Sequence, residues 1–255
     1  MESYRQSTGE TKAKVPEITL GFWVLKITAT TLGETGGDAV SMSLGLGYLA
    51  GTAIFAALFL AAVWMQIAAK KFHPLLYWVT IIATTTVGTT LADFCDRSLG
   101  IGYTGGATLL LALLLASLFL WHRSMGSIAV DTVSAPKAEL FYWVTIMCSQ
   151  TLGTALGDWS ADSAGLGYLG SASLFGGMLA LLLIGHSFTK VPKTLLFWAA
   201  FILTRPLGAV VGDFLDKPRD HGGLELGRFT ATAILLALMG GIMAIFPQRP
   251  AAKNP

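Results

Sequence analysis

One set of three residues occurs four times in this chain, and this repeat limits the possible folds more than any other feature of the sequence. In each copy a tryptophan lies ten residues before a glycine, and an aspartate lies five residues after that glycine. The tryptophans are Trp23, Trp78, Trp143 and Trp198, the glycines are Gly33, Gly88, Gly153 and Gly208, and the aspartates are Asp38, Asp93, Asp158 and Asp213. A repeat of this length is one supersecondary unit that buries its apolar face against its neighbours. We therefore expect four similar units packed together.

Long apolar runs indicate that each unit consists of helices that cross a membrane. Charged residues make up 13% of the 255 residues, whereas soluble domains have about 25%. Eight stretches are long enough to cross a hydrocarbon core of about 30 Å as a helix. They are residues 18–37, 50–69, 75–92, 101–121, 140–157, 164–185, 195–212 and 229–246. We expect an all-α polytopic membrane protein with eight transmembrane helices, in which four tandem two-helix repeats share one orientation and form two pseudo-symmetric halves.

The spacing of the glycines predicts where the two halves meet. The four glycines are 55, 65 and 55 residues apart, and the extra ten residues fall near a polar linker at 124–135. The first half should span residues 18–123 and the second half residues 136–247. We expect residues 1–17 to form an exposed cytoplasmic arm, not a cleaved signal peptide, because no short apolar region with a cleavage site follows them. Residues 248–255 should form a cytoplasmic tail.

The repeated unit resembles a known family. Four tandem units, each with two membrane segments and one tryptophan, are similar to a bacterial family of integral membrane proteins catalogued only as a repeated domain of unknown function. The repeated tryptophan, glycine and aspartate carry the resemblance, which covers nearly the whole chain. It implies a bacterial integral membrane protein and implies no activity.

The basic residues predict the orientation of the helices. Eleven lie on the side of the termini, and they are Arg5, Lys12, Lys14, Lys70, Lys71, Arg123, Lys137, Lys190, Lys193, Arg249 and Lys253. The other side has four, and they are Arg97, Lys217, Arg219 and Arg228. Basic loops stay in the cytoplasm, so both termini should be cytoplasmic, in a bacterial inner membrane.

Each tryptophan-bearing helix also carries a polar stripe on the face of its glycine. Neutral members of this stripe are Thr31, Thr86, Thr89, Gln150, Thr151 and Thr154. An unpaired polar group within a bilayer costs several kcal/mol, so the stripes should face one another, face the second helices or line a wet path.

Apart from the repeated aspartates, charged residues replace neutral ones in the stripes of the first and last copies only. Glu34 follows the glycine of the first copy, and Arg205 lies three residues before the glycine of the fourth. Four units around an axis make these two copies neighbours, so we predict a contact between Glu34 and Arg205, with Lys26 as a competing partner. Intramembrane charges of this kind suggest function; a purely structural ion pair is the alternative.

The repeated aspartates allow two interpretations. An aspartate at a helix end often caps the backbone of the following turn. Alternatively, carboxylates on four neighbouring helices could bind or conduct a cation, and Glu34, Asp38, Asp93, Asp158 and Asp213 are then the candidate metal ligands. The repeated tryptophans and glycines are interpreted as packing residues.

The sequence favours a transporter for a small cation, either a metal ion or one coupled to protons. Carboxylate and hydroxyl oxygens suit protons, Na⁺, Mg²⁺ or Mn²⁺ better than Cu⁺. No phosphate loop, nucleophile elbow or zinc-protease motif occurs, so we expect neither enzyme activity nor a cofactor. We expect the lipid bilayer and a small ion or molecule as partners, and no nucleic acid. The alternative is a non-transporting membrane protein, such as an assembly factor, a sensor, or a lipid or quinone binder.

Overall fold

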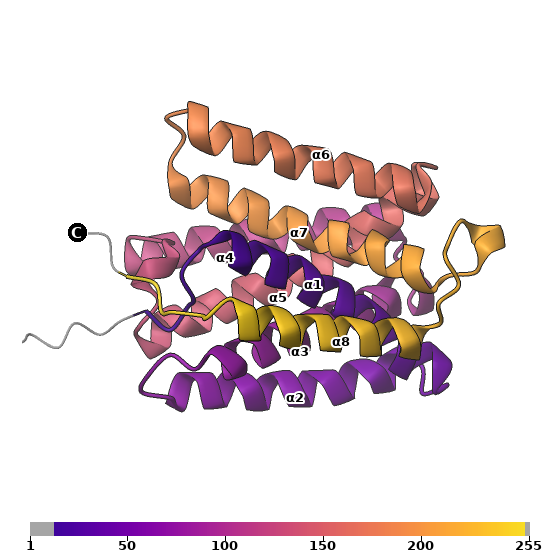
Figure 1. Ribbon diagram of the computed structural model, residues 1–255, viewed down its shortest axis with the longest axis horizontal. Helices are drawn as coiled ribbons and strands as arrows, with labels where there is room; N and C mark the ends of the chain where they lie inside the picture. Colours follow the sequence, from indigo (N-terminus) through magenta and orange to yellow (C-terminus); the bar gives the residue numbers. More distant parts are fainter. Residues whose placement is uncertain (1–12, 253–255) are drawn as a thin grey trace, which may run out of the picture.

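A computed structural model describes residues 13–252, and this part of the chain is all-α (Figure 1). Its eight long helices are α1 (Leu20–Asp38), α2 (Tyr48–Ala68), α3 (Pro74–Asp93), α4 (Tyr103–Met125), α5 (Pro136–Asp158), α6 (Gly167–Phe188), α7 (Lys193–Asp216) and α8 (Arg228–Ile245). The π-helical turns η1 (Ala39–Ser43), η2 (Phe94–Ser98) and η4 (Trp159–Ser163) follow α1, α3 and α5. Two 3₁₀ turns, η3 (Val130–Thr132) and η5 (Arg219–His221), lie in the connections before α5 and α8.

Local sequence signals explain several of the helix ends. Helices α3 and α5 begin with Pro74 and Pro136, where a missing backbone N–H costs nothing because the first turn has no acceptor for it. The hydroxyl of Thr19 caps α1 by accepting a hydrogen bond from the backbone N–H of Phe22 (3.3 Å). Helix α4 ends at Gly126, whose φ of 75° is a left-handed conformation that glycine adopts without strain.

The first helices of the four copies form an inner ring in which α1 packs on α3, α3 on α5, α5 on α7 and α7 on α1. The second helix of each copy lies outside this ring and packs chiefly on the first helix of the following copy. Thus α2 packs on α3, α4 on α5, α6 on α7 and α8 on α1. Figure 1 shows α2 and α6 at opposite edges of the molecule. This exchange between neighbouring copies joins the four repeats into one closed bundle.

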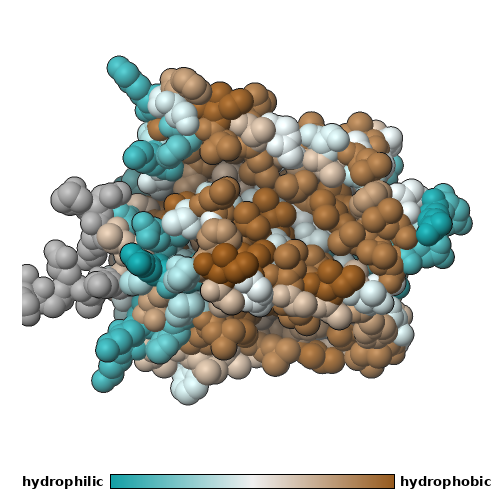
Figure 2. Space-filling view, viewed as in Figure 1, coloured by the Kyte–Doolittle hydropathy of each residue, from teal (hydrophilic) through white to brown (hydrophobic). Residues whose placement is uncertain are grey.

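Six helices of the described chain are long and apolar enough to cross a membrane, namely α2, α3 (extended through η2), α4, α6, α7 and α8. The windows of α2, α4, α6 and α8 are mostly exposed, whereas 72% of the α3 window is buried. Figure 2 shows a broad hydrophobic belt between two more polar ends. This distribution fits a helical protein of membrane character, with an apolar outside and inner helices that hold the polar groups.

The terminal segments are packed at one end of the bundle, so the prediction of an exposed arm at 1–17 is wrong for residues 13–16, whereas Glu17 is exposed. Ala13 and Val15 are buried. Backbone N–H groups of Lys14 and Ala251 donate to the carbonyls of Val133 (2.9 Å) and Val15 (2.8 Å). These three segments satisfy one another's polar groups where the helices end, so they do not extend into solvent. Residues 1–12 and 253–255 lie outside the described part of the chain.

Candidate functional site

The repeated glycines let the inner helices approach one another closely. If one of these glycines carried a Cβ atom, that atom would collide with a residue of the next copy. In each case this residue lies three positions before the repeated glycine of its own copy. The pairs are Gly33 with Thr85, Gly88 with Gln150, Gly153 with Arg205 and Gly208 with Thr30. The same register therefore recurs around the ring, and it places equivalent residues of the four copies side by side.

A second small residue, four positions after the glycine, extends this contact. A Cβ atom at Gly37 would lie 3.1 Å from Thr89 of α3, and a Cβ atom at Gly212 would lie 2.7 Å from Glu34 of α1. Small residues spaced by four are typical of closely packed membrane helices. The sequence analysis missed this position, although the spacing Gly-x₃-Gly could have indicated it.

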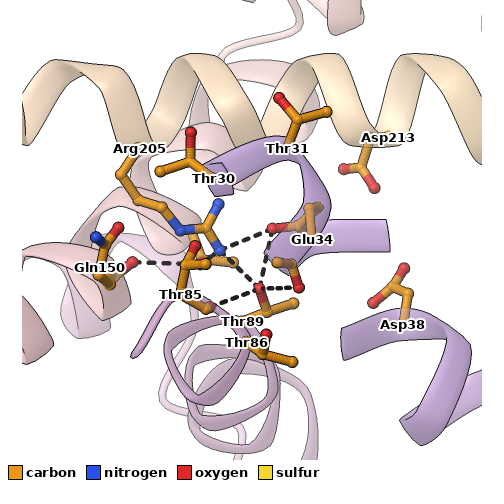
Figure 3. A network of polar contacts seen from close by, with 12 residues as sticks. Thr30, Thr31, Glu34, Asp38, Thr85, Thr86, Thr89, Gln150, Arg205 and Asp213 are labelled. Carbon is orange, nitrogen blue, oxygen red and sulfur yellow. Dashed lines mark hydrogen bonds and ion pairs between the residues drawn. The ribbon is translucent and has the colours of Figure 1, made fainter. Parts of the chain in front are cut away.

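Arg205 is at the centre of a buried network with members from all four copies (Figure 3). Its Nη2 atom lies 2.9 Å from Glu34 Oε2 and 2.6 Å from the hydroxyl oxygens of Thr89 and Thr154. The Thr89 hydroxyl lies 3.2 Å from Glu34 Oε2. Glu34 is 3% exposed and Arg205 is fully buried. The predicted contact between Glu34 and Arg205 is confirmed.

The four repeated aspartates are buried and pair with basic side chains. Lys217 Nζ lies 3.0 Å from Asp38 Oδ2 and 3.1 Å from Asp213 Oδ1. On the other side of the ring, Arg97 Nε lies 2.9 Å from Asp93 Oδ1, and Arg97 Nη2 lies 3.6 Å from Asp158 Oδ2. Each of these two bases therefore bridges carboxylates of two copies.

The hydrogen bonds at the helix ends test the capping interpretation of the aspartates. Asp38, Asp93 and Asp158 precede the π-helical turns η1, η2 and η4, but none of the three side chains makes a capping hydrogen bond there. The capping interpretation is therefore wrong for these copies. Asp213 lies within α7.

Three carboxylates come together in the manner of a cation site. One oxygen each of Glu34, Asp38 and Asp213 lies within 4.8 Å of the others, and all three residues are buried. The ammonium of Lys217 contacts two of them. Burial would lower the pKa of Lys217, but the negative charges of Asp213 and Asp38 raise the pKa above its ordinary value. A positive group thus already occupies this part of the cluster. Asp93 and Asp158, also predicted as ligands, are not members of it.

Lys26 lies apart from these carboxylates. Its Nζ atom lies 4.2 Å from the centre of the Phe201 ring, and no described residue forms a hydrogen bond or ion pair with it. The prediction that Lys26 competes for Glu34 is therefore wrong. The register of α1 explains the separation, because Lys26 lies eight residues before Glu34, which is about 12 Å of helix rise.

The predicted polar stripe divides into two groups. Thr89 and Thr154 bind Arg205, as described above. The hydroxyls of Thr31, Thr86 and Thr151 instead donate to the carbonyl four residues earlier in their own helices, at 3.0, 2.7 and 3.0 Å. These three threonines satisfy themselves locally and take no part in the network. Gln150 is fully buried, and its amide has no hydrogen-bond partner among the described residues.

Aromatic residues fill the ring toward the end that holds the termini. The residues just before the repeated tryptophans are Phe22, Tyr77, Tyr142 and Phe197, and all four are buried. The hydroxyl oxygens of Tyr77 and Tyr142 lie 2.6 Å apart. Trp78, Trp143 and Trp198 are buried, and Trp23 is half-buried. The tryptophans therefore pack as interpreted from the sequence, in a layer that fills this end of the ring.

The bases that pair with the aspartates were missed as site residues. Arg97 and Lys217 lie four residues after Asp93 and Asp213, a spacing that places side chains on one face of a helix. Arg228, at the start of α8, reaches Asp38 and Asp216 at 3.5 and 3.2 Å. The four-residue spacing could have indicated the first two bases, but nothing in the sequence links Arg228 to Asp38.

The fold and this site define an all-α protein built from repeats, with an apolar exterior and a charged interior shared by all copies. The chain belongs to the family described as a repeat of unknown function (DUF347), whose model matches residues 21–72, 76–127, 141–191 and 196–246. The predicted resemblance to a family of four tandem repeats is confirmed. Neither the curated proteins nor the solved structures include a match to the chain.

Proposed function

We propose that this protein transports a small cation, a metal ion or a proton, across a membrane. The observation that carries the proposal is the buried cluster of Glu34, Asp38 and Asp213, whose oxygens lie within 4.8 Å of one another. Carboxylate oxygens are the ligands that hard cations prefer. Buried carboxylates on membrane helices typically mark ion or proton pathways.

The charge balance of the groups that form ion pairs supports a cation as the substrate. The ion pairs around the ring join six carboxylates, from Glu34, Asp38, Asp93, Asp158, Asp213 and Asp216, to four bases, which are Arg97, Arg205, Lys217 and Arg228. With every group ionised, two negative charges remain without a basic counterpart. Taking up protons or one divalent ion would neutralise them, and this is energetically favoured where water is scarce.

The membrane placement belongs to the same proposal. All eight long helices cross a bacterial plasma membrane, and both termini lie in the cytoplasm. The polar side chains of α1 and α5 lie inside the ring, so these two helices can cross the bilayer although they are less apolar than the other six. The matched glycine contacts around the ring support four repeats in one orientation. The two halves predicted from the linker are joined by the packing of α3 on α5.

Transport would require two existing contacts to change. Lys217 occupies part of the carboxylate cluster and would be displaced when a cation enters. Further along the axis, the Glu34–Arg205 pair and the aromatic layer close the ring, and the pair would open during the cycle. Lys217 is well placed for such a movement because it follows the last residue of α7 and begins a loop.

Reconstituted vesicles test this proposal. Purified full-length protein in liposomes should accumulate Mn²⁺, Mg²⁺, Na⁺ or protons, measured with fluorescent indicators inside the vesicles. Asp213→Asn should lower the rate at least tenfold. Asp162→Asn is the matched control, because this exposed aspartate lies in η4 outside the cluster, and it should transport like the unmodified protein. Folded protein that moves none of the four ions faster than empty liposomes would favour the non-transporting alternative.

A further inference from the structure

Three long polar side chains of the inner helices have buried hydrogen-bond donors without a partner among the described residues, in addition to the hydroxyls of Thr85 and Ser149 and the indole N–H groups of Trp78 and Trp143. The three long side chains are Lys26, Gln150 and Arg205, and each is fully buried. The unpartnered donor atoms are Lys26 Nζ, Gln150 Nε2, and Nε and Nη1 of Arg205, and the acceptor Gln150 Oε1 also lacks a partner. A buried donor without an acceptor costs about 1–3 kcal/mol, and more when it is charged. Several such donors in one region indicate that something else accepts their hydrogen bonds.

These donors belong to one region of the interior. Gln150 and Arg205 occupy the same repeat position on adjacent helices, three residues before Gly153 and Gly208. Figure 3 shows Gln150 on the opposite side of Arg205 from Asp38 and Asp213. Lys26 packs over Phe201, which lies one helical turn before Arg205 on α7. Nη2 of the guanidinium binds Glu34, whereas Nε and Nη1 remain for another ligand.

The charges in this region are also unbalanced, with the opposite sign to the carboxylate cluster. Glu34 is the one carboxylate in ion-pair distance of Arg205, and no described carboxylate lies within ion-pair distance of Lys26. The Phe201 ring offers Lys26 a favourable face, but a cation–π contact leaves the N–H donors of the ammonium available. An acceptor with a negative charge would satisfy both the charge and the donors.

We propose that Lys26, Arg205 and Gln150 form a binding site for a small anion. The site lies between the Glu34–Arg205 pair and the aromatic layer that includes Tyr77 and Tyr142. Its ligand is a monovalent anion with oxygen acceptors, of the size of nitrate or formate, because the donors belong to three helices, α1, α5 and α7, of one closely packed ring that leaves no room for a larger group. This site is distinct from the carboxylate cluster, and the inference does not depend on cation transport.

Anion titrations of the purified full-length protein test the site. Sodium is held constant while gluconate, which is too large for the site, is replaced by nitrate or formate. Calorimetry should detect saturable binding at one site, and the melting temperature should rise with the concentration of the small anion. Lys26→Met should weaken binding about tenfold or more, because methionine is of similar length to lysine but has neither its charge nor its hydrogen-bond donors.

Two further variants make the test specific. Lys137→Met removes an exposed lysine near the start of α5 and should bind the anion like the unmodified protein. Gln150→Leu removes a neutral donor and should weaken binding by a smaller factor; it also reports on the site if Lys26→Met does not fold. Absence of saturable binding to the unmodified protein, or equal responses of Lys26→Met and Lys137→Met, would overturn the proposal. Because the cation is the same throughout, failure here leaves the cation proposal unaffected.

Discussion

The contact between Glu34 and Arg205 permits a quantitative test of how the first and last repeats are joined. The two side chains meet at 2.9 Å in a buried setting, and the Thr89 and Thr154 hydroxyls complete the contacts of Arg205 Nη2. Removing one partner of a buried pair leaves the other charge uncompensated, which typically costs about 3–5 kcal/mol. We therefore expect each of Glu34→Gln and Arg205→Gln to lower the free energy of unfolding by roughly this amount.

The structure indicates which single change is worse. After Glu34→Gln, Arg205 keeps a neutral oxygen acceptor and both hydroxyls. After Arg205→Gln, the carboxylate of Glu34 keeps the Thr89 hydroxyl at 3.2 Å but has no counter-charge. Glutamine retains the Cβ and Cγ atoms that pack beside Gly153, but it leaves the volume of the guanidinium unfilled. Arg205→Gln should therefore be the more destabilising change. The double variant should be more stable than the two single effects predict, with a coupling energy of about 2–3 kcal/mol.

The assay is a double-mutant cycle on the purified protein in detergent, in which unfolding is followed by circular dichroism and by tryptophan fluorescence. Coincident transitions of the two signals are needed to treat unfolding as two-state. Arg219 and Glu225, 3.9 Å apart and 82% and 62% exposed, provide the matched control pair. Their cycle should give a coupling of about 0–1 kcal/mol. If the effects of Glu34→Gln and Arg205→Gln simply add, the pair does not join the repeats and our reasoning is wrong.

Two other predictions concern the packing of the ring and its orientation. Gly153→Ala should destabilise the protein by about 1–3 kcal/mol, because the new Cβ atom would collide with a side chain of α7. Gly177→Ala is the control: no atom lies within 4 Å of its Cβ position, so this change should be neutral or stabilising by up to about 1 kcal/mol. Thermal unfolding of both variants measures the difference. Topology reporters fused after Lys71 and Val191 should read cytoplasmic, and a reporter fused after Leu99 should read exterior. An exterior reading after Lys71 would contradict both the orientation and the shared direction of the repeats.

Much of the architecture could be predicted from the sequence because the repeat constrains it strongly. Apolar length alone located the helical segments. The four-fold spacing of the glycines predicted a ring of equivalent helices, and a ring makes the first and last copies neighbours. Glu34 and Arg205 carry charge on nearly the same face of the inner helices of those two copies, four repeat positions apart. Their contact could therefore be predicted from the ring and from the high cost of an unpaired charge in the bilayer.

Other features depend on contacts between residues far apart in the chain, and only the tertiary structure decided them. The second helix of a copy is apolar on most sides, so its sequence does not specify a partner, and the structure places it on the following copy. Arg228 approaches Asp38 only because α8 packs on α1. Residues 13–16 were expected to be exposed as part of a polar N-terminal arm, yet they are buried, because the ends of neighbouring segments offer backbone partners to Lys14 and Val15.

Lys26 shows this limit most clearly. From the sequence it was one charge among three in the inner helices, and Glu34 was a plausible partner. The register of the packed helices places it instead over Phe201, one helical turn before Arg205 on α7. Repeat symmetry determines which positions face the axis, but which of those side chains come within a few ångströms of one another depends on the three-dimensional packing of all four copies.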